Sequence, residues 1–195
     1  MSGETAAEAK KKTCVFWDVD DCPVPEGLDP NSIYKNIKSA LANEGYVGDL
    51  ELMAYCADET VADGYMLDAG MTLVHKVNKH LTPMLFDICE WALDNPKGSN
   101  LLLISKFNPE EKKLVSVAVN LDRRGYNVLL ATPGEVNLGW VYFTPSSVWL
   151  WTSISKGGTS INAKEKKRKF SADTDTNSEI IADTDTDSEN RDESS

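Results

Sequence analysis

Residues 14–25 read CVFWDVDDCPVP, and they place three aspartates within four positions at the end of an apolar run. The apolar residues predict a buried β-strand over residues 14–19. Asp18 and Asp20 lie two positions apart, so they point to one side for as long as the strand persists. Two interpretations stay open. Either the acids hold a metal or a reacting group at the strand end, or Asp20 and Asp21 are turn residues.

Strands and helices alternate along the rest of the chain. Asp29-Pro30, Thr82-Pro83 and Asn108-Pro109 each combine an N-cap residue with a proline at the first helical position. Such alternation predicts a mainly parallel sheet of five or six strands, covered by helices on both faces, in a three-layer α/β/α domain. The expected helices span residues 30–43, 60–69, 82–95 and 109–125, and the expected strands span residues 14–19, 50–56, 72–77, 101–105, 127–132 and 148–151.

Composition divides the chain into three parts. We expect a flexible N-terminus over residues 1–12, one folded domain over residues 13–154 and a disordered tail over residues 155–195. The tail carries five basic residues and one acid over residues 164–170, then nine acids and one arginine over residues 171–195. The tail is expected to contact protein partners, and a purely solubilising tail is the alternative.

The formal net charge of −11 comes from the folded region as well as from the tail. A domain that binds nucleic acid over a broad surface usually shows a basic face. Because the folded region of this chain is acidic, any contact with RNA must be local, metal-bridged or weak. The four cysteines have no zinc-type spacing, and no apolar run is long enough to cross a bilayer. We therefore expect reduced thiols, no signal peptide, no membrane span and an intracellular location.

The stretch VFWDVDD resembles the signature of haloacid-dehalogenase-like phosphatases, in which an apolar strand is followed by Asp-x-Asp. This resemblance implies Asp18 as the nucleophile, Asp20 as the acid–base and Ser105 as the phosphate contact. The family also needs further acids after a later strand, and NVLLATP at residues 127–133 offers none. A phosphatase is therefore the weaker alternative.

A second resemblance covers most of the predicted domain. The segments VFWDVDDCPVPEGLDPNSIYKNIKSALANEGY, GDLELMAYCADE, WALDNP, LLLIS, RRGYNVLLATP and SSVWLWTSI occur in this order between residues 14 and 154. Together they resemble the plant group of NYN domains, PIN-like nuclease folds related to limkain-b and the meiosis-arrest regulators of RNA. The resemblance implies a metal-dependent endoribonuclease fold with single-stranded RNA as its partner.

The resemblance places only part of the family's acidic site in this chain. The family's first acid matches Asp18, and the acid within the helix that ends in WALDNP matches Asp87. After the fourth strand the family has Ser-Gly-Asp-x-Asp-Phe. Here Ser105 is kept, whereas Lys106 replaces the glycine and the next residues supply no acid at either aspartate position. Asp21 stands where the family has an asparagine.

We therefore predict a degenerate NYN domain, a non-catalytic or weakly catalytic module in RNA metabolism and the regulation of gene expression. In this interpretation Lys106 lies near Asp18 and neutralises it without a metal. Ser105 and Lys106 are the expected contacts to a phosphate or to RNA.

The alternative is an active endoribonuclease that uses Mg²⁺ or Mn²⁺. Asp18 and Asp87 are then catalytic, and Asp18, Asp20, Asp21 and Asp87 are the candidate metal ligands. One of the two glutamates at positions 110 and 111 would have to replace a missing acid.

Two further expectations concern partners and location. The loop with Trp140, Tyr142 and Phe143 is expected to contact a protein partner, with stacking on RNA bases as the alternative. The run KEKKRK at residues 164–169 has the composition of a nuclear-import or polyanion-binding segment. The expected compartment is the cytoplasm or the nucleus, and the limkain-type resemblance gives the peroxisome as the alternative.

Overall fold

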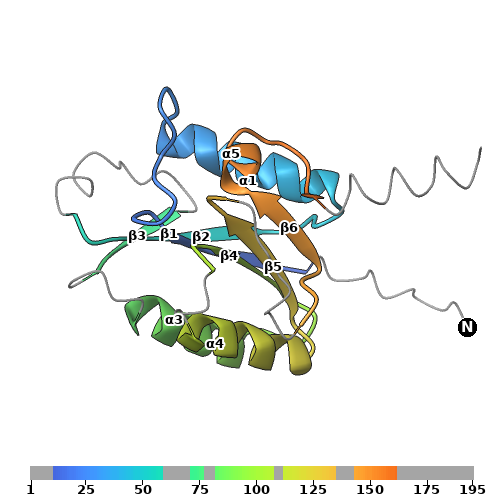
Figure 1. The fold of residues 1–195 in the computed structure, drawn as a ribbon. Helices are drawn as coiled ribbons and strands as arrows, with labels where there is room; N and C mark the ends of the chain where they lie inside the picture. The colour runs from blue at the N-terminus through green and yellow to red at the C-terminus, as the bar shows by residue number, and fades with distance from the viewer. Residues whose placement is uncertain (1–10, 59–70, 77–81, 108–111, 135–142, 162–195) are drawn as a thin grey trace, which may run out of the picture.

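The chain folds around one sheet of six parallel strands in the order β3-β2-β1-β4-β5-β6 (Figure 1). The structure is a computed structural model that describes residues 11–58, 71–76, 82–107, 112–134 and 143–161. The strands are β1 (Thr13–Asp18), β2 (Leu50–Cys56), β3 (Met71–His75), β4 (Asn100–Ile104), β5 (Asn127–Thr132) and β6 (Ser147–Leu150). The helices are α1 (Pro30–Asn43), α3 (Thr82–Asp94), α4 (Lys112–Arg123) and α5 (Trp151–Ile154).

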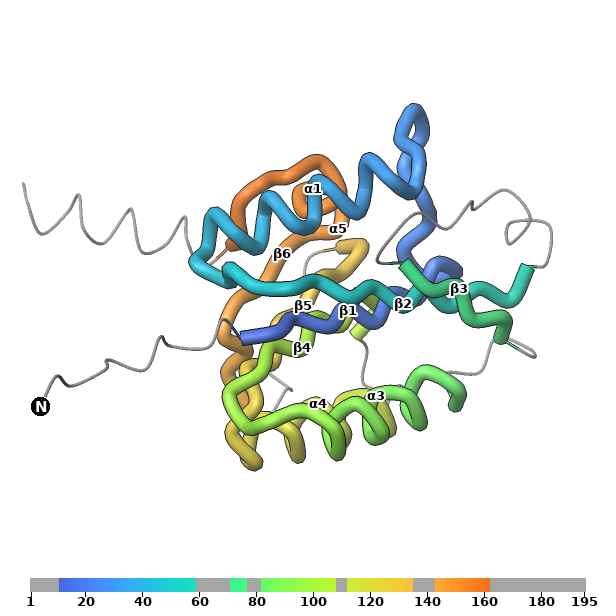
Figure 2. Tube along the Cα trace, turned by 180° about the vertical axis from the view of Figure 1, so that it is seen from behind, coloured from blue at the N-terminus to red at the C-terminus, as the bar shows by residue number. Residues whose placement is uncertain are grey.

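Helices cover both faces of the sheet. α1 and α5 lie on one face, and α3 and α4 lie side by side on the other (Figures 1 and 2). The predicted three-layer α/β/α class with a mainly parallel sheet is therefore confirmed, and the parallel pairing extends to all six strands.

β1 lies in the middle of the sheet and is buried on both sides. Its side chains alternate, so Val15 and Trp17 pack into the core under α1 and α5, whereas Phe16 packs into the core under α3 and α4. Asp18 comes two positions after Phe16 and therefore points toward the α3 side. The apolar run that ends in aspartates thus delivers a carboxylate to a buried position at the strand end.

The predicted start of α1 is confirmed in detail. Asp29 is the N-cap, and its Oδ1 accepts the backbone N–H of Ser32 at 3.0 Å. Pro30 is the first helical residue, where its missing N–H costs no hydrogen bond. The buried positions of this helix are Ile33, Ile37, Ala40 and Leu41.

Some predicted boundaries differ from the structure. The strand expected over residues 72–77 is β3, which ends at His75. The strand expected over residues 148–151 ends at Leu150, because Trp151 already belongs to α5. The helix expected over residues 60–69 lies outside the described residues, as do residues 108–111 at the expected start of α4.

The chain that follows α5 still packs against the domain. Ser155 and Ser160 are both buried. The side-chain amide of Asn36 donates to the carbonyl of Ser155 at 2.8 Å, and the backbone N–H of Ser160 donates to Oε1 of Glu44 at 3.2 Å. These contacts join the end of the described chain to α1. No helix among the described residues is both long and apolar enough to cross a membrane.

The central strand β4 offers a direct test of the core. Leu103 is fully buried between α3, α4 and the sheet, so Leu103→Ala should lower the free energy of unfolding by about 2–5 kcal/mol through lost burial and a residual cavity. Urea unfolding followed by circular dichroism measures this change. Val47→Ala, at a side chain that is 54% exposed, is the control and should change stability by less than about 0.5 kcal/mol. Equal effects of the two substitutions would contradict the assigned core.

Candidate functional site

Polar side chains gather at the carboxyl edge of the sheet, where the strand order reverses between β1 and β4. β1 ends at Asp18, β3 ends one residue before Lys76, and β4 ends one residue before Ser105. In parallel sheets the crevice beyond these strand ends is where ligands bind. The topology therefore brings residues from three strands to the position that is expected for a site.

Lys76 lies between two of the aspartates. Its Nζ is 2.7 Å from Oδ1 of Asp18 and 3.0 Å from Oδ2 of Asp20. The side chains of Lys76 and Asp18 are 1% and 4% exposed, and that of Asp20 is 19% exposed. The backbone N–H of Lys76 also donates to the carbonyl of Cys56 at 2.8 Å, which fixes the start of the side chain. The ammonium group is thus an internal cation with two carboxylates around it.

The loop after β1 turns around the Asp18 carboxylate. Oδ1 of Asp18 accepts the backbone N–H of Asp20 at 3.0 Å and that of Asp21 at 3.4 Å. The Asp20 carboxylate in turn accepts the backbone N–H of Ala57, beyond the end of β2, at 3.3 and 3.4 Å. Both carboxylates therefore have backbone donors in addition to the ammonium group. A buried charge is tolerated only with such additional hydrogen bonds.

Burial and pairing act in opposite directions on the two buried charges. Burial raises the pKa of Asp18, and the hydrogen bond and charge of Lys76 offset this only in part. Burial alone would lower the pKa of Lys76, but the hydrogen bonds and charges of Asp18 and Asp20 outweigh it, so the pKa of Lys76 is raised. Lys76 is therefore protonated at neutral pH and supplies a permanent positive charge at the strand ends.

Asp21 points to the other side of the loop and joins it to β4. Its Oδ2 accepts the hydroxyl of Ser105 at 2.8 Å and the backbone N–H of Lys106 at 2.9 Å. Ser105 is fully buried, and Lys106 is exposed. The Ser105 hydroxyl is thus used to hold the loop. A phosphate or RNA contact by Ser105 or Lys106 stays a prediction.

Asp87 faces the sheet from α3, and its partner is a tyrosine. Oδ2 of Asp87 accepts the hydroxyl of Tyr55 at 2.7 Å. Tyr55 is fully buried on β2 and is the register partner of Asp18 on β1, so the two acids belong to the same side of the sheet. Burial, and then the hydrogen bond to Asp87, raise the pKa of Tyr55, which remains a hydrogen-bond donor.

The cation beside Asp18 is a different lysine from the one expected. The sequence interpretation assigned this role to Lys106, but the structure places Lys76 there. The signal for Lys76 was its position within the apolar pattern TLVHKV, because a lysine at a buried strand end needs a carboxylate partner. The two glutamates at positions 110 and 111 lie outside the described residues, so their role as substitute acids stays a prediction.

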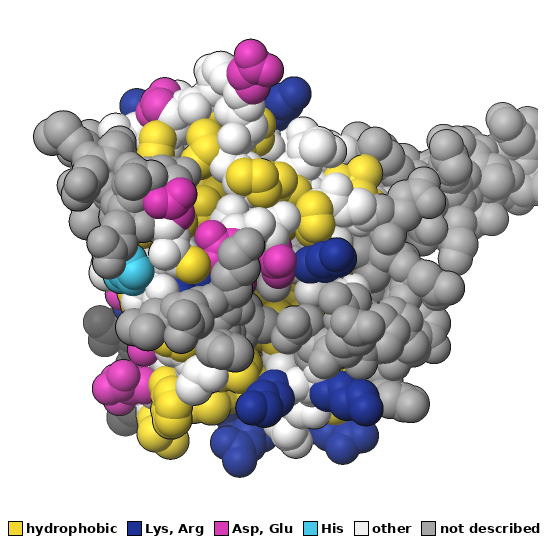
Figure 3. All heavy atoms as spheres, turned by 60° about the vertical axis from the view of Figure 1, so that its left-hand side comes forward, with side chains coloured by type: hydrophobic (Ala, Val, Ile, Leu, Met, Phe, Trp, Pro, Cys, Tyr) yellow, Lys and Arg dark blue, Asp and Glu magenta, His cyan; other side chains and the backbone are white. Residues whose placement is uncertain are grey.

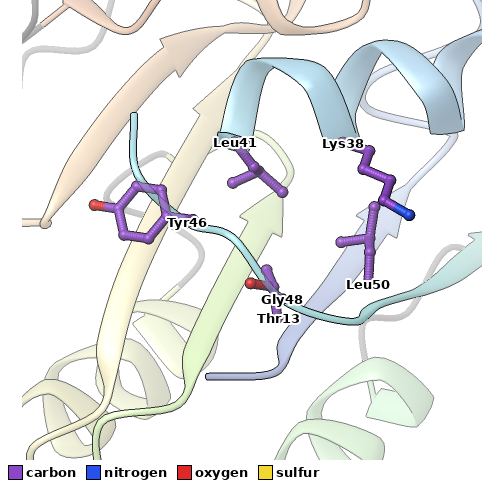
Figure 4. A pocket seen from close by; sticks show the side chains of 6 residues that line it. All are labelled: Thr13, Lys38, Leu41, Tyr46, Gly48 and Leu50. Carbon is purple, nitrogen blue, oxygen red and sulfur yellow. The ribbon is translucent and has the colours of Figure 1, made fainter. Parts of the chain in front are cut away.

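A separate depression lies at the opposite edge of the sheet. It encloses about 160 Å³ of space, part of which is open to solvent. Thr13 and Leu50, the first residues of β1 and β2, contribute to its wall, together with Leu41 and Lys38 of α1 (Figure 4). The depression is therefore remote from the acidic strand ends and contains none of the predicted site residues.

The fold and its site define a parallel α/β protein with acids at the carboxyl end of the first strand. The model of the NYN domain family matches residues 12–138, which is more than half of the chain. The chain therefore belongs to the NYN family, a class of PIN-like nuclease modules in RNA metabolism. A comparison with curated proteins gives no match.

NYN and PIN-like nucleases usually use divalent metal ions, but the described residues do not fit such an ion as they are arranged here. The Lys76 ammonium lies where a cation shared by Asp18 and Asp20 would lie. Asp21 is directed to Ser105, the residue after β4, and away from this position. Within the described ranges, no three His, Cys, Asp or Glu side chains lie close enough together to hold a metal.

The ion pair can be tested by a double-mutant cycle. Lys76→Met should lower the free energy of unfolding by about 3–5 kcal/mol, because it leaves the Asp18 carboxylate buried without its partner. Asp18→Asn combined with Lys76→Met should cost clearly less than the sum of the two single changes. Chemical unfolding of all four proteins measures the coupling. Lys113→Met, at an exposed lysine of α4, is the control. Strictly additive effects would contradict the pairing.

Proposed function

We propose that this NYN-domain protein is a non-catalytic or weakly catalytic module in RNA metabolism and the regulation of gene expression. Its acidic site is held together by an internal lysine in place of a metal ion. It acts through contacts with RNA or with protein partners. Within the family we assign it to the limkain-b and meiosis-arrest-regulator type, with an incomplete acidic site.

The position of Lys76 is the observation that carries this proposal. A metal-dependent nuclease needs an ion that polarises the phosphate and generates hydroxide from bound water. A lysine ammonium can pair with two carboxylates and offset one of their two negative charges, but it has no open coordination position for water. Because Lys76 is 1% exposed and contacts both Asp18 and Asp20, the cation between these two carboxylates belongs to the protein itself.

The neighbouring residues support the same conclusion. In the family resemblance, acids follow the fourth strand, whereas here Lys106 and Phe107 occupy the start of that segment. Phe107 is buried in the core under α3 and α4, so it has become part of the packing. Asp21 and Ser105 hydrogen-bond to each other, which stabilises the loop without an added ligand.

The site does not favour a phosphatase. A nucleophilic aspartate must be reached by the phosphorus atom of its substrate, but Asp18 is nearly fully buried and hydrogen-bonded to Lys76. Membership in the NYN family supports a nuclease-like module instead.

The expected partner surfaces lie largely outside the described residues. The residues outside the described ranges include Trp140, Tyr142 and the basic run over residues 164–169. Their contacts with RNA or protein therefore remain part of the proposal. Phe143 is described, and it packs partly buried against the core under α3 and α4. We retain the cytoplasm or nucleus as the proposed compartment, on the basis of the basic run, with the peroxisome as the alternative.

Metal binding and RNA cleavage test the proposal directly. Titration calorimetry of the full chain with Mn²⁺ should give no saturable heat. Cleavage of a single-stranded RNA should not exceed that of Asp18→Asn, because the metal position is taken by Lys76. Lys35→Gln, at an exposed residue of α1 on the other face of the sheet, is the control for nonspecific charge effects. Mn²⁺ binding and cleavage that are both lost in Asp18→Asn but kept in Lys35→Gln would establish an active endoribonuclease.

A further inference from the structure

Helix α3 has an apolar outer face. Four large apolar side chains are exposed in the part of the chain that the structure describes, and two of them, Phe86 and Leu93, lie on α3 with 71% and 84% of their surface exposed. Cys89 between them is also exposed. The three positions follow one another at intervals of three and four residues, so they form one stripe along the helix.

The same helix has a second, buried apolar stripe. Met84, Ile88 and Trp91 pack against the sheet. A helix with apolar residues on opposite sides is normally buried on both, whereas a helix at the surface of a monomer keeps a polar outer face. The outer stripe of α3 therefore indicates that a further surface packs on this helix.

The charges near this stripe have opposite signs on the two adjacent helices. α3 exposes the acids Glu90 and Asp94 and has no basic residue. α4 has exposed basic residues at its start and at its end, including the residue that follows it. Its one acidic residue is Asp122, which is half-buried. These bases are Lys112, Lys113, Arg123 and Arg124. Figure 3 shows a cluster of Lys and Arg side chains at the lower edge of the molecule, beside apolar and acidic groups.

We propose that a second copy of this chain packs on the α3–α4 face and forms a twofold symmetric dimer. A surface with an acidic half and a basic half is complementary to itself under a twofold rotation, and a twofold dimer uses the same surface on both copies. The exposed stripe of α3 supplies apolar contact surface to this interface. The inference goes beyond the proposed function and does not depend on whether the site cleaves RNA.

The charges also select the direction of the twofold axis. α3 and α4 run in the same direction, because each leads back from the carboxyl edge of the sheet to the start of the next strand. An axis across the helices would place α3 on α3 and α4 on α4, so that like charges face each other. An axis along the helices places α3 of one copy on α4 of the other. Glu90 and Asp94 then lie near Arg123 and Arg124 of the second copy.

Both helices are needed to make such an interface stable. A specific interface buries about 800 Å² on each partner, with an apolar centre and a polar rim. α3 has 13 residues and is therefore about 20 Å long, so a single stripe along it is too narrow. The two adjacent helices together provide a broader surface that includes Phe86 and Leu93.

The mass of the full chain in solution is the first test. Light scattering over a concentration series should show twice the chain mass of 21.5 kDa at high concentration. Phe86→Lys or Leu93→Lys should raise the dissociation constant at least about tenfold, because each removes an apolar contact of the interface. Val47→Lys, at an exposed apolar residue away from α3, should leave it unchanged. Circular dichroism of each variant confirms that the fold is intact.

Charge reversal tests the orientation. Glu90→Arg with Asp94→Arg makes both helices basic at their C-terminal ends. Arg123→Glu with Arg124→Glu makes both acidic there, while Lys112 and Lys113 stay at the other end of α4. Each of these double variants alone should be monomeric, and an equimolar mixture should form a heterodimer. Cys89 gives an independent signal, since the other three cysteines are buried. Its alkylation by a maleimide should slow as protein concentration rises, and this dependence should be lost in Phe86→Lys.

Two results would overturn the proposal. The first is a monomer at all concentrations, with a Cys89 alkylation rate that does not change. In that case the acidic segment over residues 171–195 or an RNA strand becomes the occupant to consider for the basic side. The second is a dimer that persists unchanged in Phe86→Lys and in both charge-reversed variants, because it would use a different surface.

Discussion

The buried ammonium group of Lys76 is the constraint on which the carboxyl edge of the sheet depends. Two aspartates at the end of a buried strand repel each other and lose hydration, so a cation must join them or one must be protonated. In this chain the cation is covalently part of the protein. Its position also links β1 to β3, which are separated in the sheet by β2, so the ion pair serves the fold as well as the charge balance.

The three aspartates at the end of β1 and in the following loop divide between two partners, and both sets of contacts have a structural role. Asp18 and Asp20 turn toward Lys76, whereas Asp21 turns toward Ser105 at the end of β4. One loop is therefore fixed to strands on both sides of the point where the strand order reverses. These ion pairs and hydrogen bonds can stabilise an acidic cluster without a metal. The presence of such a cluster in a sequence is therefore weak evidence for catalysis.

The sheet could be predicted from the sequence because its signals are local. Apolar runs of five or six residues, and pairs such as Asp29-Pro30, mark the elements with little help from distant residues. The pairing of Lys76 with Asp18 joins residues 58 positions apart, and the periodicity of either strand contains no information about it. The hydrogen bond between Tyr55 and Asp87 is non-local in the same way. The family resemblance could place Asp87 near the site but could not supply its partner.

Helix α3 connects the acidic edge to the outer surface of the molecule. Asp87 points inward and accepts the hydroxyl of the buried Tyr55, while the preceding residue, Phe86, points outward and is exposed. Adjacent side chains on a helix are about 100° apart, so one short segment can face both the sheet and a partner. A surface that packs on Phe86 restricts the helix that carries Asp87. The proposed interface and the hydrogen bond between Tyr55 and Asp87 therefore share a single turn of helix α3.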